Sequence, residues 1–310
     1  MEFTVGQSCP TVPQLATLEV LSMRVTKKAT SKYAQSLWIE EFDSLAEALD
    51  YAGQNPDPKS SNNSGSGDWA GKTGSLREAV ELGHKGYEEI RPEVERMFTE
   101  LESQLAERLE TAFQTKFDYA GSVVDVGRFL SGEPECMIDF VPEPSARMGR
   151  VVRIVVNGTC SAYVDPERII RRGVVVCALI DAVHKLGMGV EAYLEYAIND
   201  TGINDRNGKV YSSVIKLHDS QQMLDINNLM FALCHPSMFR RVGFSMLERS
   251  DWERAQYCVK HSYGYPAALE SSVRLGADVS CEMLQSGKDE YEGQKPVDWV
   301  MSTLSGLGVL

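Results

Sequence analysis

Residues 150–198 carry the strongest pattern in the chain and limit the folds that it can adopt. Five of the six residues 151–156 are apolar, and four are Val. Apolar residues on both faces are typical of a strand inside a sheet that is covered on each side. Asp165, Pro166 and Glu167 then predict the start of a helix, because they supply a capping side chain, a first-turn proline and a first-turn acid.

The predicted helix ends before Gly187, and residues 190–198 form a second β-rich run. A strand, a helix and a strand of these lengths indicate two parallel strands joined by a right-handed crossover. Residues 210–217 predict a third strand. We therefore expect an α/β fold with a central, mostly parallel sheet and covering helices.

The N-terminal half has mainly helical patterns. Capping boxes begin at Ser44 and Ser75, and an apolar stripe over residues 92–117 predicts one long helix. The composition of residues 55–68 predicts a flexible loop. Prolines at 142 and 144 suggest a boundary between a mainly helical region, 1–141, and an α/β domain, 146–310.

Composition excludes several classes of protein. The formal net charge of −13 argues against a general coat for nucleic acid or membranes, although an acidic protein can keep cations in one groove. The seven cysteines show no metal-binding spacing and predict reduced thiols. No signal peptide and no apolar run of membrane-spanning length is found, so we expect a soluble, cytoplasmic protein without membrane partners.

Cations gather around the predicted β-α-β unit. Arginines precede the first strand, and three more follow the helix start at i, i+3 and i+4 spacing, on one face. In one interpretation they bind phosphates while an aromatic ring stacks on bases; in the other they pair with the glutamates of residues 93–110. The candidate nucleic-acid-binding residues are Arg147, Arg150, Arg153, Arg171, Arg172, Arg240, Arg241, Trp69 and Lys72.

A second interpretation concerns the loop after the first predicted strand. Residues 157–161, Asn-Gly-Thr-Cys-Ser, loosely resemble the Asp-x-Ser-x-Ser metal motif of von Willebrand factor A domains. That resemblance implies a protein-binding scaffold that holds Mg²⁺ through Thr159, Ser161 and Asp219. Asn157 departs from the motif, because the first ligand is normally Asp.

No motif for catalysis is found. The chain lacks a glycine-rich phosphate loop, Gly-x-Ser-x-Gly and His-Glu-x-x-His, and its five histidines are isolated. We therefore predict a protein that is not an enzyme and that needs no cofactor.

Two stretches carry a wider resemblance. One is DWAGKTGSLREAVELGHKG at 68–86; the other joins RRGVVVCALIDAVHKLGMGVEAYLEYA at 171–197 with LDINNLMFALCHPSMFRRVGF at 224–244. They resemble a family of poorly characterised phage and bacterial proteins that includes a podovirus single-stranded-DNA-binding RNA polymerase cofactor. The resemblance implies a transcription factor of the host cytoplasm whose partners are single-stranded DNA and a phage RNA polymerase. It is compatible with a homo-oligomer, and it transfers no binding residue.

Overall fold

The computed structural model describes residues 26–29, 31, 34–63, 68–109, 113–142, 149–291 and 293–309. Its main feature is a seven-stranded sheet in the order β1-β2-β8-β7-β6-β10, with β9 added to β7. The predicted α/β class is confirmed. The strands are β1 (Thr26–Ala29), β2 (Ser36–Phe42), β6 (Val151–Asn157), β7 (Gly189–Asn199), β8 (Lys209–His218), β9 (Tyr265–Pro266) and β10 (Val279–Cys281).

The predicted β-α-β unit is also confirmed. β6 and β7 are parallel, with Asn157 beside Glu195, and α6 (Pro166–Lys185) connects them. β10 lies parallel to β6 on its other side, whereas β8 runs antiparallel to β7. The ends of β6, β7 and β10 therefore lie at one edge of the sheet, which we call the carboxyl edge.

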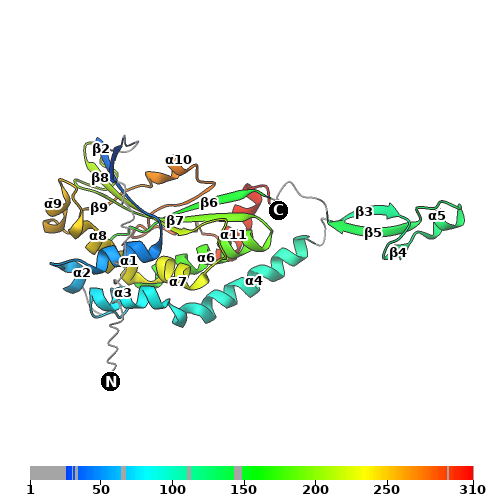
Figure 1. Cartoon of the computed structure of the whole chain (residues 1–310), viewed down its shortest axis with the longest axis horizontal. Coiled ribbons are helices and arrows are strands. Elements are labelled where there is room, and N and C mark those ends of the chain that lie inside the picture. The colour runs from blue at the N-terminus through cyan, green and yellow to red at the C-terminus, as the bar shows by residue number, and fades with distance from the viewer. Residues whose placement is uncertain are drawn as a thin grey trace, which may run out of the picture.

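Helices cover one face of the sheet (Figure 1). α6 packs against α7 (Ile226–Cys234) closely because Gly173 has no side chain: a Cβ there would lie 2.3 Å from the Leu233 carbonyl oxygen. The other face has a smaller apolar cluster that includes Ile39, Val214 and Ala267. The remaining helices of the body are α1 (Leu45–Gly53), α2 (Ser60–Asn63), α3 (Leu76–Lys85), η1 (Glu88–Ile90), α4 (Arg91–Leu109), η3 (Met238–Val242), α8 (Gly243–Arg249), α9 (Ala255–Lys260), α10 (Ser271–Leu275) and α11 (Pro296–Gly306).

The expected boundary at residues 141–146 does not separate two cores. β1 and β2 belong to the same sheet as β6, and one buried cluster includes Phe42, Leu101 and Ile154. The separate unit is instead residues 113–142, which we call the arm. It contains β3 (Phe113–Asp118), β4 (Val123–Val124), α5 (Val126–Leu130) and β5 (Met137–Pro142), and it projects from the body in Figure 1.

Two local expectations differ from the structure. The long helix ends at Leu109 rather than at 117, because Phe113 and Phe117 belong to β3 and pair with β5. The flexible loop was predicted over residues 55–68; residues 55–63 are held in place, and residues 64–67 lie outside the described residues. Ser61 is buried, and its amide and hydroxyl both donate to the Glu248 carboxylate (3.1 and 2.6 Å). Among the described residues, no helix is both long and apolar enough to cross a membrane.

Candidate functional site

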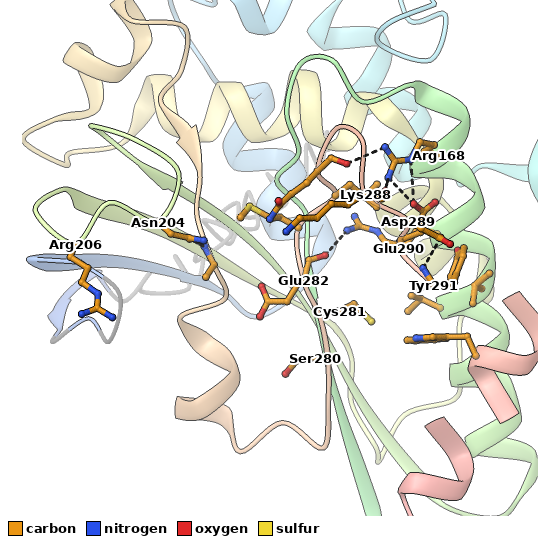
Figure 2. Close-up of a pocket in the computed structure, with 18 residues that line it drawn as sticks. Arg168, Asn204, Arg206, Ser280, Cys281, Glu282, Lys288, Asp289, Glu290 and Tyr291 are labelled. Carbon is orange, nitrogen blue, oxygen red and sulfur yellow. Dashed lines mark hydrogen bonds and ion pairs between the residues drawn. The ribbon is translucent and has the colours of Figure 1, made fainter. Parts of the chain in front are cut away.

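Two cavities open at the carboxyl edge. The loop after β6 and the loop after β10 meet there, where Cys160 forms an isolated parallel bridge with Leu284. The polar cavity, of about 690 Å³, is lined by the first turns of α6 and by residues 280–291 (Figure 2). The aromatic cleft, of about 350 Å³, is lined by the loop after β6 and by residues 262–266. Ligands of open α/β sheets bind at this edge.

Arg168 holds the loop that walls the polar cavity. Its Nε and Nη2 donate to Glu290 Oε2 (3.2 and 2.7 Å), and its Nη1 and Nη2 donate to the carbonyl oxygens of Gln285 (3.1 Å) and Lys288 (2.5 Å). The bonds appear in Figure 2, where Arg206 lies on the far side of the cavity. An arginine that donates to three groups of one loop at once fixes the loop geometry better than a lysine can.

Three residues that line this cavity have a buried polar atom without a partner in the described chain. Arg172 Nε, Glu290 Oε1 and Tyr291 Oη are buried and make no hydrogen bond within the described chain. Arg172 is 5% exposed and donates from Nη1 to the Glu282 carbonyl oxygen (3.2 Å), and burial lowers the pKa of its guanidinium. Burial also raises the pKa of Tyr291. Unsatisfied buried polar groups are energetically unfavourable, and here three of them belong to neighbouring residues of one cavity wall.

The lining of the polar cavity is more positive than the chain as a whole. Its lining includes four cations and three carboxylates, although the net charge of the chain is −13. Arg206 and Lys288 are exposed, and Trp299 contributes an aromatic ring. Glu282 and Asp289 are exposed as well, so the exposed charges of the lining balance, and the one additional positive charge comes from the less exposed arginines.

The aromatic cleft is built around Arg240. This residue lies in η3, a π-helical segment of a kind frequent at functional sites. It donates to the carbonyl oxygens of Trp69 (2.6 Å) and Val164, its guanidinium lies 4.5 Å from the Trp69 ring, and its Nε has no partner in the described chain. The other rings that line the cleft are Tyr163, Tyr196, Phe239, Phe244, Tyr263 and Tyr265.

The predicted arginine groove is not assembled. Arg150 and Arg153 lie at the start of β6, away from the carboxyl edge. Arg150 donates to the Leu307 carbonyl oxygen (2.6 Å), and Arg153 forms an ion pair with Glu191 (2.7 Å). These two residues therefore cannot join the cations of the polar cavity, and Arg147 lies outside the described residues.

The other predicted residues divide into buried and exposed groups. Arg241 is buried and donates to Thr73 and to the carbonyl oxygens of Ser61 and Asn62, so it supports the fold, and Arg172 and Arg240 are buried beside the two cavities. Arg171 and Lys72 are exposed, and Trp69 lines the aromatic cleft, where its Nε1 donates to the Ala162 carbonyl oxygen (3.1 Å).

The structure does not bring the three predicted metal ligands Thr159, Ser161 and Asp219 together. Asn157 Oδ1 accepts from the amide and hydroxyl of Thr159 (2.9 and 2.5 Å), so these groups satisfy one another. Ser161 follows them at the carboxyl edge, whereas Asp219 lies at the opposite edge because β8 is antiparallel to β7. The described residues contain no cluster of three metal-binding side chains.

The thiols at this edge are not activated nucleophiles. Burial raises the pKa of Cys160 even though Arg240 and Arg172 oppose the shift, and burial raises the pKa of Cys281 to about 11. Both thiols stay protonated at neutral pH, whereas catalytic cysteines need a lowered pKa. Cys160 and Cys281 therefore lack the lowered pKa of a catalytic cysteine.

Sequence reasoning missed the residues of the loop after β10. Glu290 and Tyr291 stand in a polar stretch that has no periodicity, and β10 is only three residues long. The available signal was topological: a short strand parallel to β6 would bring its following loop beside the loop after β6.

A comparison with known families finds a match over residues 23–308 to a domain of unknown function, DUF7192. No curated protein and no solved structure matches the chain. Because the match spans nearly all of the sequence, including both cavities and the arm, the chain belongs to the DUF7192 family.

Proposed function

We propose that this protein binds single-stranded nucleic acid at the carboxyl edge, with an unpaired base in the polar cavity, and that it catalyses no reaction. One observation carries the proposal: Arg172, Glu290 and Tyr291 line one cavity, and each has a buried polar atom without a partner in the described chain. A base edge presents donors and acceptors side by side, which is the complement of this set.

The surroundings support the same ligand. Trp299 offers a ring for stacking, and Arg206, Lys288 and Arg171 are cations near the mouth that can meet phosphates. A base inside a duplex could not enter the cavity without unpairing, so the site favours single strands. Recruitment of a phage RNA polymerase, which the sequence resemblance implies, stays a prediction.

The test is a titration of fluorescently labelled single-stranded and double-stranded oligonucleotides of equal length, followed by anisotropy over a series of salt concentrations. We expect the single strand to bind more tightly, with a linear decrease of log K against log salt concentration. An abasic strand of the same length is the matched control, and it should bind less tightly than the strand with bases. Equal affinity for the abasic strand, or no binding at low salt, would contradict the proposal.

A further inference from the structure

The aromatic cleft contains a polar group that the fold leaves unused. Tyr196, in β7, lines the cleft and is 5% exposed, and its hydroxyl has no hydrogen-bond partner in the described chain. Unlike Arg240 Nε, this hydroxyl is not fully enclosed by the described chain. The ring lies against the start of α8, where a Cβ at Gly243 would come within 2.6 Å of it. A buried tyrosine normally bonds through its hydroxyl, so this hydroxyl is available to a ligand.

Exposed rings stand at the mouth of the cleft. Tyr163 is 86% exposed and Tyr265 is 47% exposed, and Ile203 beside them is 54% exposed. Rings that are open to solvent are platforms on which planar bases stack. An aliphatic ligand could cover the same rings, but it would leave the Tyr196 hydroxyl unpaired. The lining therefore favours a planar ring with a polar edge.

The charge of the cleft favours an anion. Its lining has no carboxylate, whereas the lining of the polar cavity has three and the chain has a formal net charge of −13. Arg240 is the one cation in the lining, and it forms no ion pair in the described chain; Asp165 influences its pKa without pairing with it. The field of this buried charge reaches the cleft without any contact to the ligand. Rings, an unused hydroxyl and a positive field together suit a base that carries a phosphate.

The cleft and the polar cavity adjoin one another. Cys160 lines the cleft and is bridged to Leu284, which lines the polar cavity, so the two linings are one strand spacing apart there, about 4.8 Å. Ile203 lines the cleft, and the next residue, Asn204, lines the polar cavity (Figure 2). Two adjoining cavities at one edge suit consecutive bases that are splayed apart.

We propose that the aromatic cleft holds a second unpaired base, next in the strand to the base in the polar cavity. The inference rests on the proposed function and adds the requirement for two consecutive bases. Tyr163 stacks on the second base, and the Tyr196 hydroxyl, which can donate or accept, bonds to its edge.

The experiment is an anisotropy titration with labelled strands of equal length that are abasic except for one base or for two consecutive bases. The second base should strengthen binding at least about fivefold, because stacking one base contributes about 1 kcal/mol or more. Tyr163→Ala should abolish most of this gain, and Tyr196→Phe should reduce it. Both variants should melt like the wild type, because one ring is exposed and the other loses only an unpaired hydroxyl. The matched control is Tyr257→Ala, which removes an exposed ring outside both cavities and should keep the gain.

The possible failures separate this inference from the proposed function. If the second base gives no gain although Tyr291→Phe still weakens binding, the cleft is not a second base site and the polar cavity remains the first. A gain that persists in full in Tyr163→Ala or in Tyr196→Phe would place the second base elsewhere. If no strand binds at all, the nucleic-acid proposal is wrong, and this inference is wrong with it.

Discussion

Arg168 and Glu290 form an ion pair of 2.7 Å between α6 and the loop after β10, and their side chains are 20% and 9% exposed. The pair uses one oxygen of the carboxylate and leaves the other, Oε1, without a partner in the described chain. The bond that shapes the polar cavity thus also fixes the orientation of a carboxylate whose second oxygen is buried and unpaired. A loop held by bidentate arginine bonds is preorganised, so less entropy is lost when a ligand binds.

Replacing Tyr291 by Phe should weaken binding without weakening the fold. Its hydroxyl has no partner within the described chain, so its removal leaves the free energy of unfolding nearly unchanged. We expect the dissociation constant for single-stranded DNA to rise about three- to tenfold, which corresponds to about 1 kcal/mol. Anisotropy titration and urea unfolding measure the two quantities.

The matched control is Tyr263→Phe. That hydroxyl donates to Glu248 Oε1 and accepts from the Ser60 amide (2.5 and 2.9 Å). The control should lose stability and keep its affinity. If Tyr263→Phe lost affinity and Tyr291→Phe lost only stability, the result would count against a ligand in the polar cavity.

The cations at the two edges of the sheet should differ in their effect on the salt dependence. Neutralising Arg171 and Arg206 together should flatten the slope of log K against log salt concentration by about 1.4, since each single-strand phosphate contact contributes about 0.7. Neutralising Arg150 and Arg153 should leave that slope unchanged, because these residues lie at the other end of β6 and contact Leu307, Asp278 and Glu191. If only the variant without Arg150 and Arg153 had a flattened slope, the binding surface would have to lie at the opposite edge of the sheet.

Glu248 should control protease access to residues 55–63. Its carboxylate accepts from Ser61, from the Lys59 amide (3.2 Å) and from Asn55 (2.6 Å). Glu248→Ala leaves these donors without their acceptor, so we expect the free energy of unfolding to fall by about 3 kcal/mol. Trypsin should then cleave rapidly after Lys59, and mass spectrometry of the digest measures that rate. The exposed Asp57→Ala variant is the control, and slow cleavage in both variants would show that other contacts hold the segment.

Acid should destabilise the protein through His235. Burial lowers the pKa of this imidazole to about 4, and its Nδ1 lies 2.7 Å from Ser237 Oγ and accepts from the Ser237 amide (3.2 Å). Because the folded pKa is below the unfolded value of about 6.5, the unfolded state binds the proton first. The stability that comes from keeping His235 neutral is fully present above about pH 6.5. As the pH falls towards 4, the free energy of unfolding decreases by about 3 kcal/mol.

Urea unfolding at pH 7 and at pH 4.5 measures this effect. The His235→Asn variant should lose less stability on acidification than the wild type, whereas the exposed His261→Asn variant should follow the wild type. An equal loss in the wild type and in His235→Asn would exclude His235 as the acid-sensitive group.

The sequence predicts the β6-α6-β7 unit well because its signals are local: apolar runs, a capped helix start and a helix of ordinary length. It does not predict the arm, because the apolar stripe continues through Phe113 and Phe117, and only pairing with β5 makes those residues a strand. Nor does it predict the burial of Arg240 and Arg241. Their carbonyl acceptors belong to residues up to 180 positions away along the chain.

The same limit explains the candidate site. Arg172 and Tyr291 are far apart in sequence, and only the position of β10 beside β6 brings them to one cavity. The clustering of arginines in the sequence suggested a groove. Clustering alone does not distinguish buried arginines that stabilise the fold from arginines that face solvent. Trp69 and Lys72 were selected by their position beside a polar stretch; Trp69 lines the aromatic cleft, and Lys72 lines a third cavity beside the first turn of α6.

Photocrosslinking tests the central claim most directly. Single-stranded DNA that carries 5-iodouracil, irradiated with the full-length protein and digested, should yield crosslinked peptides that contain Tyr291 or Trp299, the aromatic residues that line the polar cavity. The Tyr291→Phe variant should crosslink less, and double-stranded DNA should compete poorly. Crosslinks confined to the arm, to the aromatic cleft or to the opposite edge of the sheet, with none in residues 280–309, would contradict the account.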